Sequence, residues 1–168
     1  MCERVSEPFA STVAGYDAIA PEFAARWFDF RLPEEVARFT DHLRPGARVL
    51  DLGCGPGRDV AHLQELGFRA VGADLSVGML AEGRQRGVGP FVCADMHALP
   101  FANDAFDGLW CCASLLHVPR DRVPVFLNEC RRVLEHGYLY LAVKQGEGEA
   151  WIEDARGNRY FFTYYHPA

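Results

Sequence analysis

The segment VLDLGCGPGRD, residues 49–59, places three glycines at alternate positions directly after an apolar run. Gly53, Gly55 and Gly57 would let the backbone itself lie against a ligand, because a Cβ atom at these positions would occupy the ligand's space. The spacing resembles the dinucleotide fingerprint G-x-G-x-x-G, but the third glycine comes one residue early and Arg58 stands where the later one would be. The pattern predicts a flat ligand on a strand-to-helix turn.

The charges around this turn indicate which kind of ligand it binds. A diphosphate favours the bare N-terminus of a helix, whereas Asp51 ends the preceding strand and Asp59 falls in the first helical turn. A ligand whose nearest group is cationic fits better. S-adenosylmethionine is an adenosine derivative without phosphates that carries an ammonium and a sulfonium. Asp51 would lie near its amino acid part, Asp74 would accept hydrogen bonds from two ribose hydroxyls, and Asp95 would accept one from the adenine amine.

Alternating strands and helices are expected to position these residues. The chain predicts an α/β fold, a doubly wound and mostly parallel Rossmann-like sheet preceded by N-terminal helices. In such a sheet ligands bind beyond the carboxyl ends of the strands, where the three acids and the segment 113–117 fall. The expected strands are RVLDL (48–52), FRAVGADLS (68–76), PFVCADM (90–96), one within 105–117 and YLYLAVK (138–144), and the expected helices are RDVAHLQELG, SVGMLAEGRQRG with Ser76 as N-cap, and RDRVPVFLNECRRVLEHG.

Residues 6–30 are expected to form helical segments broken near Pro21. Residues 32–43 predict an amphipathic helix with one apolar stripe. We interpret the whole chain, residues 1–168, as a single domain with a helical cap, a cofactor-binding core and a truncated tail. The stripe is Leu32, Val36, Phe39 and Leu43, and the three parts are residues 1–45, 46–146 and 147–168.

Five segments occur in a fixed order along the chain: VLDLGCGPGRD, GADLS, CADMHALPF, FDGLWCCASLLHVP and RRVLEHGYLYLAVK. Together they resemble the motifs of the class I S-adenosylmethionine-dependent methyltransferases of the small-molecule type, over roughly residues 12–148. The glycine motif and the position of Asp74 carry most of this resemblance. It implies methyl transfer to a small-molecule acceptor with release of S-adenosylhomocysteine.

The resemblance also implies a role for individual residues. The three glycines would line the methionine moiety, and Asp74, followed by Leu75, would bind the ribose. Asp95 and the backbone of Met96 would contact the adenine. The segment from Ser114 to His117 would run past the methyl group.

Two of the implied roles have open alternatives. Tyr16 lies in a helix that often closes over the cofactor in this family, and its side chain either contacts the cofactor or packs between helices. His117 is either a general base, since histidine titrates near neutrality, or a hydrogen-bonding wall residue. His97 is expected to be a solvated turn residue.

The end of the chain departs from the family pattern. The segment after Lys144 ends at Ala168, where relatives usually continue through another helix and two strands, so the sheet is expected to be incomplete. The aromatic segment 159–165 would form a strand, or a hairpin with 149–155, and at an uncovered edge it would promote self-association. Besides an active methyltransferase, the sequence therefore leaves open an inactive binding module or a truncated product that needs a partner chain. The missing later glycine and Asp51 argue against a nicotinamide dehydrogenase.

Composition restricts the remaining function classes. The formal net charge of -6 disfavours broad nucleic-acid binding. No apolar run reaches the roughly 20 residues needed to cross a bilayer, and no secretory signal is evident, so we expect a cytoplasmic protein without a membrane partner. Six cysteines without a C-x-x-C pair make disulfides and a zinc site unexpected. Cys111 and Cys112 are either apolar residues on opposite faces of a buried strand or reactive thiols.

Overall fold

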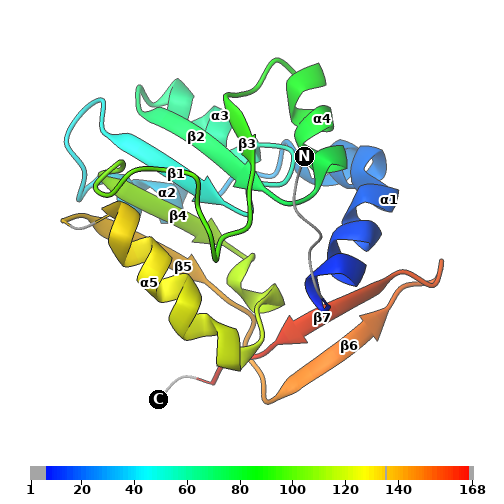
Figure 1. Cartoon of the computed structure of the whole chain (residues 1–168). Helices are drawn as coiled ribbons and strands as arrows, with labels where there is room; N and C mark the ends of the chain where they lie inside the picture. The colour runs from blue at the N-terminus through cyan, green and yellow to red at the C-terminus, as the bar shows by residue number, and fades with distance from the viewer. Residues whose placement is uncertain (1–6, 135, 167–168) are drawn as a thin grey trace.

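A computed structural model describes residues 7–134 and 136–166 of the chain. Helices and strands alternate as expected over the middle of the sequence (Figure 1). Short 3-10 turns follow the fourth strand, at Leu115–His117 and Arg120–Arg122. The elements are α1 (Phe9–Trp27), α2 (Pro33–Thr40), β1 (Arg48–Leu52), α3 (Arg58–Glu65), β2 (Arg69–Asp74), α4 (Val77–Gln85), β3 (Phe91–Cys93), β4 (Gly108–Cys112), α5 (Val123–Leu134), β5 (Tyr138–Ala142), β6 (Glu149–Glu153) and β7 (Arg159–Thr163).

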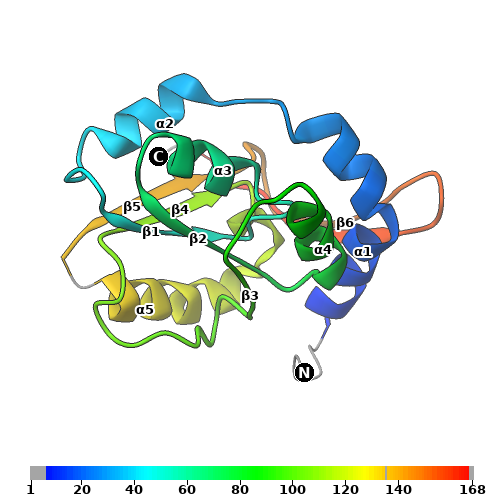
Figure 2. The ribbon, with the colours of Figure 1, turned by 90° about the horizontal axis from the view of Figure 1, so that it is seen from above.

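Five parallel strands form the central sheet in the order β3-β2-β1-β4-β5. The strand order reverses between β1 and β4, so a crevice opens there beyond the carboxyl ends of the strands. Helices α2 and α3 cover one face of the sheet and α5 covers the other (Figure 2). The predicted doubly wound parallel sheet is confirmed.

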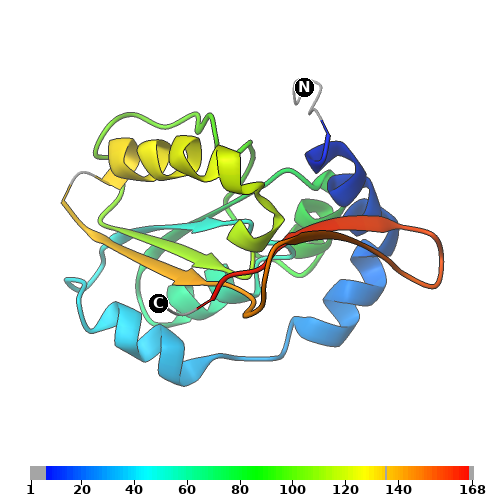
Figure 3. The ribbon, with the colours of Figure 1, turned by 90° about the horizontal axis from the view of Figure 1, so that it is seen from below.

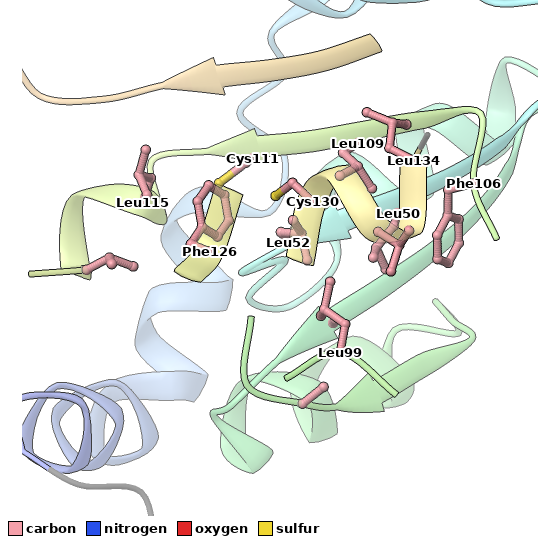
Figure 4. Close-up of a cluster of buried hydrophobic side chains, with 14 residues drawn as sticks. Leu50, Leu52, Leu99, Phe106, Leu109, Cys111, Leu115, Phe126, Cys130 and Leu134 are labelled. Atoms are coloured by element: carbon pink, nitrogen blue, oxygen red, sulfur yellow. The ribbon is translucent and has the colours of Figure 1, made fainter. Parts of the chain in front are cut away.

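Alternation along the strands divides the core into two apolar layers. Leu50 and Leu52 of β1 point to the α5 side, where they pack with Phe126 and other buried residues (Figure 4). Val49 points to the opposite side, into the cluster that holds Trp110. Both layers are fully buried, as expected for strands covered on both faces. The packing of these two layers holds the strands in place and thereby positions the residues at their carboxyl ends.

Helix α1 runs without a break through Pro21, which corrects the expected interruption. Pro21 is exposed. The part of α1 that precedes Pro21 is attached to the start of α4 through Asp17. The Asp17 Oδ1 accepts hydrogen bonds from the Ser76 Oγ at 2.5 Å and the Gly78 N at 2.8 Å, at the start of α4. Ser76 caps α4 as predicted, because its Oγ accepts from the Met79 N. Helix α2 is shorter than the predicted 32–43: Val36 and Phe39 of the stripe are buried within it, and Leu32 and Leu43 lie just outside it and are partly buried.

Strands β6 and β7 form an antiparallel hairpin, with Glu149 opposite Thr163. The hairpin is the expected pairing of the aromatic tail with the segment before it. It does not extend the edge of the central sheet but lies beside α1 (Figures 1 and 3). The C-terminal segment therefore reaches the N-terminal helix, near the carboxyl ends of the central strands.

The cysteines depart from expectation at one position. Cys93 is disulfide-bonded, which corrects the prediction that the chain has no disulfide, and Cys2 lies outside the described residues. Cys54, Cys111, Cys112 and Cys130 are free thiols. Within residues 7–134 and 136–166, no helix combines the length and apolar character that a bilayer span requires.

Candidate functional site

A cavity of about 240 Å³ lies at the carboxyl ends of β1, β2 and β4, roofed by α1. All of the site residues predicted from the sequence line it except Gly57. The structure thus brings together residues that are up to 101 positions apart in the sequence, Tyr16 and His117. The predicted residues that line the cavity are Tyr16, Asp51, Gly53, Gly55, Asp74, Leu75, Asp95, Met96, Ser114 and His117.

The three glycines of the loop do different things. A Cβ on Gly53 would lie 2.2 Å from the Ser114 Cβ, so Gly53 allows the β1 loop to touch the segment after β4. A Cβ on Gly55 would meet nothing within 4 Å, and this backbone is open to a ligand. Gly57 precedes the first residue of α3 with φ +80, and a Cβ there would lie 2.5 Å from the Phe91 ring. Gly57 therefore serves packing and helix initiation, and the expectation that it lines the cavity is not met.

Asp74 ends β2 and holds the glycine loop in place. Its Oδ2 accepts a hydrogen bond from the Gly55 N at 2.8 Å, and its Oδ1 accepts one from the Ser76 N at 2.8 Å. Burial raises the pKa of the Asp74 carboxyl, and these backbone donors counteract the effect. Each carboxylate oxygen can accept more than one hydrogen bond, so Asp74 can also accept from a ligand hydroxyl in the cavity.

Asp51 and Asp59 differ in how their charges are compensated. Asp59 accepts from the Arg58 Nε at 2.8 Å and Nη2 at 2.7 Å, and from the Trp110 Nε1 at 2.9 Å. Asp51 is buried without such a partner among the described residues. Burial and the neighbouring Asp59 raise the pKa of the Asp51 carboxyl well above its usual range. Of the two acids that the sequence associated with a cationic ligand, only Asp51 lacks a cationic partner among the described residues.

Asp95 is held by the residue two positions later. Its Oδ1 accepts from both the backbone N and the ring Nδ1 of His97, at 2.8 and 2.7 Å. Despite partial burial, these bonds lower the pKa of the Asp95 carboxyl. The Oδ2 atom has no hydrogen bond within the described part of the chain and is free for a ligand. His97 is only 8 % exposed, beside the Phe9 ring, which corrects the expectation of a solvated turn residue.

Tyr16 and His117 form a hydrogen-bonded pair in the wall of the cavity. The His117 Nδ1 lies 2.7 Å from the Phe161 carbonyl oxygen, which can only accept, so this nitrogen carries a proton. The His117 Nε2 lies 2.9 Å from the Tyr16 Oη. Burial lowers the pKa of His117 to about 4 and raises that of Tyr16. At neutral pH the imidazole is uncharged, and its Nε2 accepts the Tyr16 hydroxyl proton in a hydrogen bond.

Several lining residues were not found from the sequence. One face of α1 contributes Phe9, Thr12, Val13, Phe23 and Trp27. Their helical spacing with Tyr16 was the signal that could have revealed them. Ala113, which belongs to the segment 113–117 expected at this edge, also lines the cavity directly after β4, with a left-handed φ of 57. Strained backbone of this kind collects at functional sites.

The cysteines near the cavity behave as thiols. Burial raises the pKa of Cys111 to about 12 and that of Cys112 to about 11. Neither carries thiolate character at neutral pH, so the apolar interpretation of these two residues is favoured over a reactive one. Among the residues that the structure describes, no group of three or more histidine, cysteine or acidic side chains is arranged to hold a metal ion.

Comparison with known proteins identifies the family. Residues 50–141, more than half of the chain, match a family described as "Methyltransferase domain". The chain is 37% identical over 116 residues to the methyltransferase GfsG of Streptomyces halstedii, covering 64% of this chain and 40% of that protein. It is 48% identical over 67 residues to a demethylmenaquinone methyltransferase of Corynebacterium urealyticum, covering 40% and 29%. The chain thus spans less than half the length of these curated relatives.

Solved structures share the fold. The 1,6-didemethyltoxoflavin-N1-methyltransferase of Burkholderia thailandensis, solved with its acceptor and S-adenosylhomocysteine, has a TM-score of 0.71 and 22% identity. The alignment covers 98% of this chain and 76% of that one. The family match, the parallel sheet and the cavity at its switch point agree. This chain belongs to the class I S-adenosylmethionine-dependent methyltransferase family.

Proposed function

We propose that this chain, acting as a single domain, transfers the methyl group of S-adenosylmethionine to a small-molecule acceptor and releases S-adenosylhomocysteine. The observation that carries the proposal is the cavity at the switch point, where an open glycine backbone meets the acidic side chains that end three neighbouring strands. The relatives named above include methyltransferases of small molecules, which supports an acceptor of that class.

The side chains in the cavity fit the cofactor. Asp51, buried and uncompensated, would pair with the ammonium group, and Gly55 leaves room for the methionine chain. Asp74 and the adjacent Leu75 would hold the ribose. The free Oδ2 of Asp95 would accept from the adenine amine, while the backbone of Met96 contacts the ring. A diphosphate would be repelled by the same carboxylates.

The hydrogen-bonded pair of Tyr16 and His117 would orient the acceptor. When bound, the cofactor supplies a methyl group activated by a positive sulfur. The protein then needs to hold the acceptor in line and to exclude water. Tyr16 and His117 line the cavity, as does Ser114 beside the glycine loop, and α1 forms the roof. Because both ring nitrogens of His117 are hydrogen-bonded, we assign it a positioning role and not that of a general base.

A calorimetric titration of the native chain tests the proposal. We expect micromolar binding of S-adenosylhomocysteine and none of NAD. Asp74→Ala should weaken binding at least about tenfold, whereas the exposed control Asp121→Ala should leave it unchanged. Binding of NAD in place of S-adenosylhomocysteine would overturn the proposal, and so would unaltered affinity in Asp74→Ala.

The alternative of an inactive module that needs a partner chain gains no support from the geometry, because the hairpin already contacts the cavity walls. Self-association through the aromatic tail stays a prediction, as does a cytoplasmic location. In β7, Tyr160 and Thr163 are buried within the chain, and β6 exposes Trp151 and Ile152. Sedimentation velocity of the native chain and Ile152→Lys would detect such an association, since the charge should weaken it.

A further inference from the structure

The charge of the cavity lining is strongly unbalanced. Four carboxyl groups line it, those of Asp51, Asp59, Asp74 and Asp95, against the one guanidinium of Arg58. Burial raises the pKa values of Asp51 and Asp74, and a cation bound beside them would favour their ionised forms. Arg58 is already engaged, because two of its nitrogens donate to Asp59. Among the described lining residues, no cation is left to receive an anionic acceptor. The cavity therefore favours positive charge and repels negative charge.

The lining also lacks a base suited to remove a proton from a hydroxyl group. Both nitrogens of His117 are hydrogen-bonded, one to Tyr16 and one to the Phe161 carbonyl. The hydroxyl of Tyr16 and the thiol of Cys112 keep their protons at neutral pH, because burial raises their pKa values. Of the four carboxylates, Asp59 is paired with Arg58 and the other three are proposed to hold the cofactor. The lining therefore offers no free base for an acceptor that must lose a proton before it attacks the methyl group.

We propose that the methyl acceptor is an uncharged nitrogen nucleophile, an aromatic amine or a ring nitrogen; this rests on the proposed function. The nitrogen lone pair forms the new N–C bond while the S–C bond breaks, and its electron pair returns to sulfur as a neutral thioether. The positive charge passes from sulfur to nitrogen. Where the nitrogen carries a hydrogen, the proton leaves to water after the transfer.

Charge conservation explains the preference. With a nitrogen acceptor the site holds one positive charge at the reacting centre from start to end, and the surrounding carboxylates stabilise it throughout. With a phenolate or carboxylate acceptor the two opposite charges cancel as the bond forms, and the lining offers such an anion no free cation to bind, because Arg58 is paired with Asp59. The aromatic rings of Phe9, Phe23 and Trp27 in the lining suit a flat acceptor.

Two matched triplets of acceptors test the inference on the native chain. Aniline, phenol and benzoate form one, and 2-naphthylamine, 2-naphthol and 2-naphthoate form the other, each incubated with methyl-labelled S-adenosylmethionine. We expect the amine to lead in kcat/KM by at least about tenfold. A lead by the hydroxyl or carboxyl compound would overturn the inference. It would also be overturned if no amine were methylated while S-adenosylhomocysteine still bound.

A binding measurement without turnover provides a second test. S-adenosylhomocysteine is neutral at sulfur, and its analogue sinefungin carries an ammonium group where the methyl would be. We expect sinefungin to bind at least about fivefold more tightly in calorimetry. Equal or weaker binding would contradict a cation-favouring centre. If S-adenosylhomocysteine itself fails to bind, the proposed function fails; if it binds and the acceptor order is reversed, only the present inference fails.

Discussion

Single residues in the glycine loop show how one residue type serves three purposes. Gly53 makes room for Ser114, Gly55 leaves the backbone open, and Gly57 makes room for Phe91. All three have a positive φ, which side chains other than glycine adopt at a cost. Neighbouring packing therefore decides how severe a substitution is at each position.

Gly53→Ala should destabilise the fold much more than a glycine-to-alanine substitution whose only cost is the positive φ of the backbone. We expect a loss of about 3 kcal/mol in the free energy of unfolding, from φ strain plus the clash with Ser114. The matched control is Gly67→Ala, with φ +86 and no atom within 4 Å of the new Cβ, which should lose only about 1 kcal/mol. Denaturant unfolding of both variants measures the difference, and equal losses would show that the contact with Ser114 does not matter.

His117 should make stability depend on pH. Its folded pKa of about 4 lies below the usual 6.5, so the unfolded chain binds the proton more readily. The resulting stability is present above about pH 6.5 and is lost as pH falls towards 4. Between about pH 7.5 and about pH 5 the imidazole should account for about 2 kcal/mol of lost stability.

His117→Asn isolates this effect from the titrating carboxylates. Denaturant unfolding of the variant should show a pH dependence smaller by that amount than the native chain does. Identical pH dependence in the two proteins would mean that His117 is not held in its neutral form.

At the scale of elements, the hairpin joins two walls of the cavity. The Phe161 N donates to the Thr12 Oγ1 of α1 at 3.0 Å, and its carbonyl accepts from His117. The Thr163 Oγ1 donates to the Val118 carbonyl at 2.7 Å. These hydrogen bonds link the hairpin both to α1 and to the turn after β4, and we call this connection the clasp. Figure 3 shows the hairpin beside α1. Helix α1 and the turn after β4 both carry residues that line the cavity.

Thr12→Val should loosen this clasp without changing the volume of the side chain much. The Phe161 N–H would lose its partner, at a cost of about 1–3 kcal/mol. Binding of S-adenosylhomocysteine should weaken in Thr12→Val, whereas Thr12→Ser, which keeps the hydroxyl group, should bind it as the native chain does. The control is Arg156→Ala, which removes the exposed ion pair with Glu22 at the hairpin tip and should cost at most about 1 kcal/mol. Calorimetry and denaturant unfolding of the three variants compare these effects; similar losses in Thr12→Val and Arg156→Ala would refute the clasp.

A feature of the structure could be predicted from the sequence where neighbouring residues or a general rule of sheet topology produce it. Asp51, Asp74 and Asp95 were predictable because the ends of parallel strands meet at one edge of a sheet. The cap at Ser76 was predictable because it is formed within a few residues. The contact of Asp17 with α4 and the burial of His97 are long-range effects of packing, and neither has a local pattern. The position of the hairpin could not be inferred either, since pairing of β6 with β7 does not specify what the hairpin covers.

At the scale of the molecule, the cavity is built by parts far apart in the sequence. Helix α1 supplies the roof and the strand ends supply the acids. The hairpin holds His117 through the Phe161 carbonyl, and His117 is in turn hydrogen-bonded to Tyr16. Tyr160 adds a further contact, because its ring lies 5.1 Å from that of Tyr16. A ligand in the cavity should therefore stabilise the two ends of the chain together.

Hydrogen exchange with and without S-adenosylhomocysteine tests this coupling. A ligand at about one hundred times its Kd stabilises the folded state by about 2.7 kcal/mol. Amides of α1 and of the hairpin should gain protection together, although the hairpin does not line the cavity. In Thr12→Val, measured at a ligand concentration that keeps the site filled, α1 should still gain protection while the hairpin gains less. Protection confined to the glycine loop and residues 94–97 in the native chain would show that the hairpin is independent of the site, because a clasp that bears on the ligand must respond to it.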